Sequence, residues 1–297
     1  MTKKPAIIIL TALGLGGIFY LVMVLASLMS SGRASKPITS ITGSGKVALL
    51  KIEGVLLSSE HIVEEINDYA DDSSIKAIIV RVDSPGGGVV PSQEIYNALL
   101  NARKEGKKVV ISMGSVAASG GYYIAAAADR IVANPGTLTG SLGVKMEFAN
   151  IEKLLEKVGV RGMVIKAGEF KDIGSPYRDM TEPEKKLLQG VIDDVHTQFI
   201  EAVAKGRSLD SAVVRGIADG RIFTGRQALD LKLVDQLGDL EDSIRTAAEL
   251  AGIKGKPSIV KKQKKLPFLE YLKDETAGWI SDVIARSIGG SVVKLQY

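Results

Sequence analysis

The segment KVVISMGSVAASGGYYIAAAAD, residues 108–129, joins a strand, a glycine turn and the start of a helix in direct succession. KVVISMG at 108–114 has the β-branched character of a buried strand, and SGGYYIAAAAD at 119–129 opens an alanine-rich helix. Ser119 stands at the junction, where the first backbone N–H groups of the helix have no partner within the helix. This strand–turn–helix unit is typical of an α/β sheet, and it makes Ser119 a candidate nucleophile.

The regions on either side of this unit continue the alternation of strands and helices. SQEIYNALLNARKEG at 92–106 has apolar residues at helical spacing, and from 181 to 251 the pattern is mostly helical. We therefore predict a mainly parallel sheet with crossover helices. A last amphipathic helix is predicted within 267–290. The flanking strands are predicted at VALLKIEGVL (47–56), AIIVRVD (77–83), RIVANP (130–135) and MVIKAG (163–168).

An uninterrupted apolar run occupies residues 6–29. As a helix it would rise about 36 Å, which is enough to cross a hydrocarbon core of about 30 Å. A cleaved secretory signal is the alternative, but its apolar region normally has about 7–15 residues. Lys3 and Lys4 favour a cytoplasmic N-terminus, although Arg33 and Lys36 on the far flank weaken that bias. We therefore predict a single-pass protein of the cell membrane with its folded domain outside the cytoplasm.

Composition predicts one folded domain behind this anchor. Its residues include 25 Lys and Arg against 30 Asp and Glu between 37 and 253, whereas 254–265 carries six lysines and no acid. The basic run indicates a solvated linker or, alternatively, a patch for anionic lipids. Without interleaved aromatic residues it does not indicate nucleic-acid binding. The predicted parts are a cytoplasmic N-terminus (1–5), a transmembrane helix (6–29), a flexible linker (30–45), a catalytic domain (46–253) and a basic, partly helical tail (254–297).

The residue inventory restricts the chemistry open to this domain. The chain has no cysteine, which excludes disulfides, thiol nucleophiles and thiolate metal sites, and we predict neither a metal nor a cofactor. Only two histidines are present, His61 and His196, and their acidic helical surroundings predict that both face solvent. A serine nucleophile needs a base beside it, and with imidazole scarce a neutral lysine is the remaining candidate.

Two glycine-rich turns provide candidate donors for an oxyanion. The N–H of Gly120 follows Ser119 directly, and DSPGGG at 83–88 follows a predicted strand. Pro85 restricts the backbone of that loop, and its glycines can adopt angles that direct an N–H group towards the site. We therefore predict an oxyanion hole formed by Gly87 and Gly120. The alternative for both segments is an ordinary turn, because glycine and proline occur in loops of every kind.

Four motifs together resemble the signal peptide peptidase A family in its short form. They are VDSPGGG (82–88), SVAASGGYYIA (115–125), GTLTGSLGV (136–144) and KAGEFKDIGSPYR (166–178), and the resemblance covers roughly 45–250. It implies a caseinolytic protease/crotonase-like α/β fold, preceded by one transmembrane helix, and the activity of a serine endopeptidase. The tail beyond 255 matches the family in character only.

The resemblance also implies a role for individual residues. The nucleophile falls on Ser119 and the general base on Lys171 rather than on Lys166, which would give a Ser/Lys dyad. A typical lysine has a pKa near 10.4, so a base needs burial that lowers this value. Ser141 is the candidate for orienting the amine, although its hydroxyl equally suits a local turn. For Lys171 the alternative is a surface lysine paired with Asp172.

Substrates and partners follow from the same resemblance. It implies apolar peptide substrates, the signal peptides left in the membrane after cleavage, which would bind as an added strand. It also implies a homo-oligomer, with an octamer as the expected number and dyads shared between neighbouring subunits. Alternatives are a protease that trims a stomatin-like membrane partner, a crotonase-like acyl-CoA enzyme and a non-catalytic membrane scaffold. The residues that would line the groove, unless they belong to the core, are Val89, Val90, Tyr122 and Tyr123.

Overall fold

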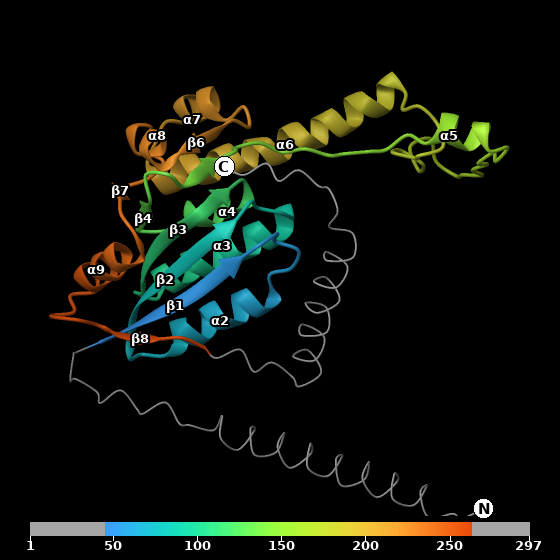
Figure 1. Cartoon of the computed structure of the whole chain (residues 1–297). Coiled ribbons are helices and arrows are strands. Elements are labelled where there is room, and N and C mark those ends of the chain that lie inside the picture. The colour runs from blue at the N-terminus through green and yellow to red at the C-terminus, as the bar shows by residue number, and fades with distance from the viewer. Residues whose placement is uncertain (1–44, 263–297) are drawn as a thin grey trace, which may run out of the picture. The chain divides into compact units, whose positions relative to one another are not determined.

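The central sheet has the strand order β6–β5–β3–β2–β1–β8; β4 also pairs with β3, and β7 pairs with β4 (Figure 1). The computed structural model describes residues 45–262. Among them every strand pairing is parallel except that of β5 with β6, so the predicted mainly parallel sheet is confirmed. The strands are β1 (Lys46–Glu53), β2 (Ile75–Ser84), β3 (Lys108–Ala118), β4 (Arg130–Ala133), β5 (Leu138–Gly140), β6 (Ile222–Thr224), β7 (Gln236–Leu237) and β8 (Ser258–Val260).

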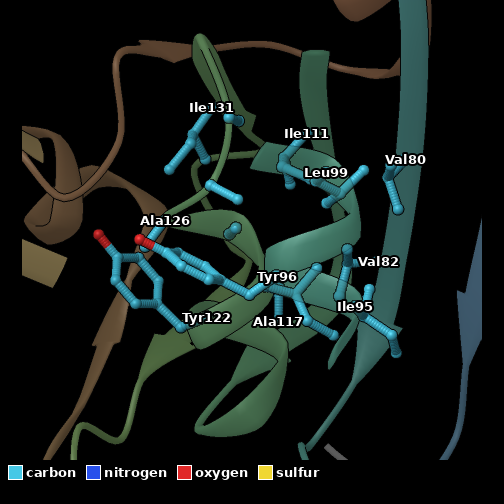
Figure 2. Packing of buried hydrophobic residues seen from close by; sticks show 14 of the residues in the cluster. Val80, Val82, Ile95, Tyr96, Leu99, Ile111, Ala117, Tyr122, Ala126 and Ile131 are labelled. Carbon is cyan, nitrogen blue, oxygen red and sulfur yellow. The ribbon is translucent and has the colours of Figure 1, made fainter. Parts of the chain in front are cut away.

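Helices cover both faces of this sheet, which explains why β1 and β2 are almost continuously apolar. Ile95 and Leu99 of α3 pack with Val80 and Ile111 on one face, where Figure 2 shows them side by side. A smaller cluster around Ala247 of α9 covers the other face. The helices are α2 (Glu60–Asp71), α3 (Val89–Lys104), α4 (Gly120–Ala125), α5 (Glu152–Lys157), α6 (Glu182–Arg207), α7 (Ser211–Ile217), α8 (Gly225–Asp230) and α9 (Leu240–Leu250).

Helix α6 reaches well beyond the sheet. Thr181 and Glu184 form a reciprocal capping box that fixes its start. Its C-terminal half is buried through Phe199 and Val203, whereas Leu187 in the N-terminal half is 43% exposed. Figure 1 shows this exposed half leading away from the sheet towards α5. The residues around α5 are therefore held at the end of a rigid helix rather than against the core.

Two sequence predictions about this domain are wrong. MVIKAG (163–168) forms no strand, because none of the strands described between 45 and 262 pairs with it, and Ile165 is 94% exposed. The tail predicted from 254 begins later, because β8 pairs in parallel with β1 at Lys46–Ala48. The short strand β8 lies within the lysine-rich stretch 254–265, and the charge of that stretch favours a solvated linker over a strand.

None of the helices described between 45 and 262 is long and apolar enough to span a membrane. The predicted transmembrane helix at 6–29 and the predicted amphipathic helix at 267–290 lie outside the described residues. Both remain sequence predictions.

Candidate active site

Ser119 lies in a strained turn between β3 and α4. The last residue of β3, Ala118, pairs with Gly140 of β5, and the Ser119 N–H donates to the Gly140 carbonyl at 2.9 Å. The backbone angles of Ser119 are φ 52° and ψ −120°, a combination that costs a residue with a side chain about 1–3 kcal/mol. The Ser119 carbonyl accepts from the Tyr123 N–H at 2.9 Å, which locks the turn onto α4. The partly buried serine is thereby placed in the wall of a cleft.

Gly87 is aligned by a bridge to Leu56. The Leu56 N–H donates to the Gly86 carbonyl at 2.9 Å, and the Gly88 N–H donates to the Leu56 carbonyl at 2.8 Å. In a parallel bridge of this kind the N–H of the middle residue points away from the bridging strand. A Cβ atom at Gly87 would lie 2.3 Å from the Leu56 carbonyl oxygen, so only glycine fits there. The bridge therefore directs the Gly87 N–H away from Leu56.

The loop of Gly87 and the Ser119 turn are in direct contact. A Cβ atom at Gly120 would lie 3.3 Å from the Gly87 nitrogen and 2.3 Å from the Ser92 Oγ, and one at Gly86 would lie 2.6 Å from the Gly120 nitrogen. Between residues 45 and 262 neither the Gly87 N–H nor the Gly120 N–H has a hydrogen-bond partner. Two free backbone donors beside a serine have the arrangement that stabilises the oxyanion of a tetrahedral intermediate.

Gly87→Ala is expected to remove one of these donors. The new methyl group overlaps Leu56, so the loop has to shift, and losing one oxyanion donor lowers kcat by about 10²–10³-fold. The measurement is peptide hydrolysis together with thermal unfolding. Gly136→Ala is the matched control, because a Cβ atom there meets only the Asn134 Oδ1 at 3.9 Å. A Gly87→Ala protein with the kcat of the control would contradict the role of Gly87.

The cleft beside Ser119 has a volume of about 510 Å³ and mainly apolar walls. Phe199 of α6 stacks against Tyr123 with 5.0 Å between ring centroids, and Tyr123 meets Tyr96 edge-on at 5.1 Å. Burial raises the pKa of the Tyr123 hydroxyl, which keeps this wall neutral. The lining residues are Val55, Pro85, Gly86, Gly87, Val89, Ser92, Gln93, Ser119, Gly120, Tyr123, Gly143, Val144, Lys145, Val195 and Phe199.

Two of the four predicted groove residues line the cleft, one is exposed outside it and one belongs to the core. Val89 and Tyr123 line the cleft, whereas Val90 is 60% exposed and lies outside the lining. Tyr122 corrects the prediction: it is fully buried, and its hydroxyl donates to the Leu233 carbonyl at 2.8 Å. Figure 2 shows Tyr122 among the core side chains. Consecutive residues of a helix point in different directions, so only one of the two tyrosines can face the cleft.

Sequence reasoning missed the contribution of α6 to the cleft. Val195 and Phe199 come from this helix, which is far from Ser119 in the sequence. Their spacing of four residues indicates one apolar helix face. That signal predicts burial but does not distinguish a cleft wall from an ordinary core contact.

Lys171 lies outside the cleft of its own chain. It is exposed, in a turn whose backbone is closed by a bond from the Lys171 N–H to the Gly168 carbonyl at 3.3 Å. Asp172, the next residue, is bound through Arg178 to Glu184 at the start of α6. The described chain therefore places Ser119 beside the N–H groups of Gly87 and Gly120 but does not bring Lys171 to them.

The predicted orienting residue Ser141 lies one strand away from Ser119. It follows β5 directly, as Ser119 follows β3, and it also has a positive φ, of 52°. Its N–H donates to the Arg221 carbonyl at 2.8 Å. Ser141 is partly buried and is absent from the cleft lining, and Lys171, the amine it is predicted to orient, is exposed in a separate turn.

One lysine and two histidines need to be considered as other bases. Lys145 lines the cleft, but its side chain is 79% exposed and its Nζ is paired with Glu147 at 2.6 Å. His61 is exposed as predicted. His196 is partly buried, and its Nε2 has no hydrogen-bond partner among the described residues, so the prediction that it faces solvent is wrong. It lies on α6, whose packing against the core covers part of the ring, and it is not among the cleft residues.

Comparison with known families decides the class of this site. A model of peptidase family S49 matches residues 101–254, and a model of the Clp proteases matches residues 52–137. The chain belongs to peptidase family S49. It is therefore a serine peptidase, and the predicted caseinolytic protease-like fold is confirmed.

Relatives of this S49 peptidase are similar over most of its length. A Synechocystis protein named "Putative protease" is 48% identical over 209 residues, which are 70% of this chain and 75% of the relative. An Enterococcus faecium protein named "Putative signal peptide peptidase SppA" is 34% identical over 269 residues, covering 87% and 74%. The solved structure of a mutant membrane-bound stomatin-specific protease matches 75% of this chain and 99% of its own at a TM-score of 0.50. Its identity is 15%, so this likeness concerns the fold alone.

Proposed function

We propose that this S49 peptidase is a membrane-anchored endopeptidase in which Ser119 attacks the peptide carbonyl and Lys171 is the general base. The observation that carries the proposal is the pair of N–H groups, of Gly87 and Gly120, that have no partner among residues 45–262 and lie beside the strained Ser119 turn. Strained backbone of this kind costs stability and is concentrated at active sites. No cofactor has a part in this chemistry.

The proposed reaction passes through an acyl-enzyme. The neutral amine of Lys171 takes the proton from Ser119 as the hydroxyl oxygen bonds to the scissile carbonyl carbon. The N–H groups of Gly87 and Gly120 bind the resulting oxyanion. The tetrahedral intermediate then collapses: the C–N bond breaks as the lysine ammonium protonates the leaving amine, and the acyl group stays on Ser119 as an ester. A water molecule, deprotonated by the same lysine, attacks this ester. The C–O bond to Ser119 then breaks, and the lysine returns the proton to the serine oxygen.

We propose that the dyad is shared between neighbouring subunits of a homo-oligomer, with an octamer as the expected number. Supporting this, the turn of Lys171 is bound to the start of α6, whereas Val195 of the same helix lines the cleft. Glu184 and Val195 are separated by about 16 Å of helix at 1.5 Å per residue. Large apolar side chains are also exposed in this region, with Met163 at 87% and Ile165 at 94%, as expected of a surface that a second copy covers.

The proposed substrates are apolar peptides, namely signal peptides remaining in the membrane after cleavage from exported proteins. The apolar cleft beside Ser119 and the name of the Enterococcus relative support this class. The predicted anchor at 6–29 would hold the domain at the membrane, and the lysines before it favour a domain outside the cytoplasm.

Among the alternatives, trimming of a stomatin-like partner draws on a fold likeness that carries no information about substrates. A crotonase-like acyl-CoA enzyme would also use two N–H groups around a thioester. Neither this enzyme nor a non-catalytic scaffold needs the Ser119 hydroxyl, so neither alternative explains the strained backbone at Ser119.

The substrate proposal is tested with the full chain in detergent micelles. A synthetic signal peptide and a peptide of equal length, with aspartates at every third apolar position, are compared by kcat/KM. We expect the apolar peptide to be preferred by at least about 10-fold, because each side chain that fits an apolar pocket contributes about 1–3 kcal/mol. Equal rates would contradict the substrate class. Cleavage restricted to intact membrane proteins would favour the stomatin-like alternative.

A further inference from the structure

A partly buried ion cluster lies between the turn of Lys171 and helix α6. The Arg178 guanidinium binds both oxygens of Asp172, with its Nε at 2.9 Å and its Nη2 at 2.8 Å. The Nη1 of Arg178 binds the Glu184 Oε2 at 2.8 Å, and its Nη2 binds the Oε1 of the same carboxylate. We call Asp172, Arg178 and Glu184 the Arg178 clamp.

The Arg178 clamp is better shielded than a surface salt bridge. The Asp172 side chain is 11% exposed and that of Glu184 is 4% exposed. Hydrogen bonds from Arg178, and then from Lys166 within the same turn, hold the pKa of Asp172 well below its ordinary range. Hydrogen bonds from Arg178 also lower the pKa of Glu184 to about 2. All three groups are therefore charged at neutral pH. A planar guanidinium that binds two carboxylates in this way fixes their relative positions as well as their charges.

The clamp joins the lysine turn to the first turn of α6. Asp172 follows Lys171 directly, and its carbonyl accepts from the Ser175 N–H at 3.0 Å. Glu184 also accepts from the Thr181 N–H at 2.8 Å, which closes the capping box. A displacement of Arg178 would thus free the turn while the helix itself keeps its start.

The other end of α6 is fixed at the cleft. Phe199 lies fifteen residues after Glu184, about 22 Å along the axis, and it stacks on Tyr123 in the cleft wall. The helix is continuous between these points. The clamp therefore sets where the lysine turn stands relative to the cleft of its own subunit, and by symmetry relative to the next subunit.

We propose that Arg178 is a positioning residue, which holds the Lys171 turn on α6 so that the amine meets Ser119 of a neighbouring subunit. The inference rests on the proposed function of Lys171. It adds a requirement for the bidentate guanidinium, because a lysine at 178 can offer only a point charge to each carboxylate.

The first test measures kcat and KM of Arg178→Gln in the full chain. We expect kcat to fall about 10–100-fold, since a misplacement of about 1 Å can cost 10²-fold, while KM stays within threefold. Arg178→Lys is expected to restore part of the loss. Arg161→Gln is the matched control, because it removes one exposed positive charge that forms no ion pair among residues 45–262.

The second test separates positioning from stability. Mixed subunits of Ser119→Ala and Lys171→Ala form sites with serine from one chain and lysine from the other. Arg178→Gln is added either to the Ser119→Ala chain, which supplies the lysine, or to the Lys171→Ala chain, which supplies the serine. We expect activity to fall about 10–100-fold only in the first arrangement, whereas simple destabilisation would lower both.

The outcomes distinguish this inference from the proposed function. If Lys171→Ala alone stays active, the proposed base is wrong and the inference falls with it. If Lys171→Ala is inactive but Arg178→Gln has the kcat of Arg161→Gln, the inference alone is wrong. Equal losses in the two mixed arrangements also overturn it. If no mixture regains activity despite subunit exchange, the meeting of the amine with a neighbouring Ser119 is refuted.

Discussion

Ser119→Ala is expected to abolish peptide hydrolysis, with a loss in kcat of about 10⁴-fold or more, because no nucleophile remains to form the acyl-enzyme. Labelling by a fluorophosphonate probe should disappear with it. The fold should persist, since the side chain of Ser119 makes no capping bond to α4. The measurements are steady-state hydrolysis, probe labelling and thermal unfolding on the same preparation.

Nearby serines provide the controls for this substitution. Ser115 is exposed on the same strand, and Ser115→Ala should retain the parent activity within a few-fold. Ser112 is buried, and its Oγ accepts a hydrogen bond from the Arg81 guanidinium at 2.9 Å, which links β3 to β2 within the sheet. A Ser119→Ala protein that still labels covalently at either position would show that the nucleophile has been assigned wrongly.

Lys171→Ala is expected to lower kcat by about 10²–10⁴-fold, the usual cost of losing a general base. Lys145→Ala and the double variant of His61 and His196 are the comparisons, because they remove the other candidate bases. Each should stay within a few-fold of the parent, after correction for folded protein in the case of partly buried His196. Loss of activity in the double variant with normal folding would return imidazole to the mechanism.

Mixing the two inactive proteins tests whether the site is shared. A mixture of Ser119→Ala and Lys171→Ala subunits should regain activity after exchange. If equal amounts mix at random, about a quarter of the contacts between subunits bring an intact serine to an intact lysine, and about a half do so if the two subunits alternate. A mixture that stays inactive despite demonstrated exchange would place both residues of each site in one chain.

The pH profile of hydrolysis tests the lysine base. Only a neutral amine accepts a proton, so activity should rise from mild acid to alkaline solution. A flat profile from about pH 5 to 9 would count against a lysine base.

The Arg178 clamp makes the stability of the folded protein depend on pH in acid solution. Its carboxylates have lowered pKa values, so its contribution is present above their unfolded values and is lost in strong acid.

The sequence predicted the parts of the site that depend on strand ends and turns. Ser119 and Gly87 both follow buried strands, and parallel strands bring such positions to one edge of the sheet. The contacts of Lys171 could not be predicted in this way. Lys171 is exposed on a segment that projects from the sheet, and no local sequence pattern indicates which residues contact such a side chain. The strand predicted at MVIKAG (163–168) is wrong for a related reason. Its apolar character predicts burial, but the described chain offers no strand or core to cover it.

Tyr122 and Tyr123 show a finer limit. Both are aromatic residues in the first turn of α4, and either one suits a cleft wall by composition. The choice depends on the rotation of that short helix, which is set by the bond from the Tyr123 N–H to Ser119 and by the Leu233 carbonyl that receives the Tyr122 hydroxyl. Neither contact leaves a sign in the sequence near the two tyrosines.

The left-handed backbone at Ser119 sets stability against activity at a single position. Glycine adopts φ 52° without the steric cost that any side chain incurs, a difference of about 1–3 kcal/mol. A screen for heat resistance alone would therefore favour a Ser119→Gly chain that survives higher temperatures and cleaves nothing. Thermostable variants of this peptidase are best selected while hydrolysis is monitored, because the most direct local gain in stability removes the nucleophile.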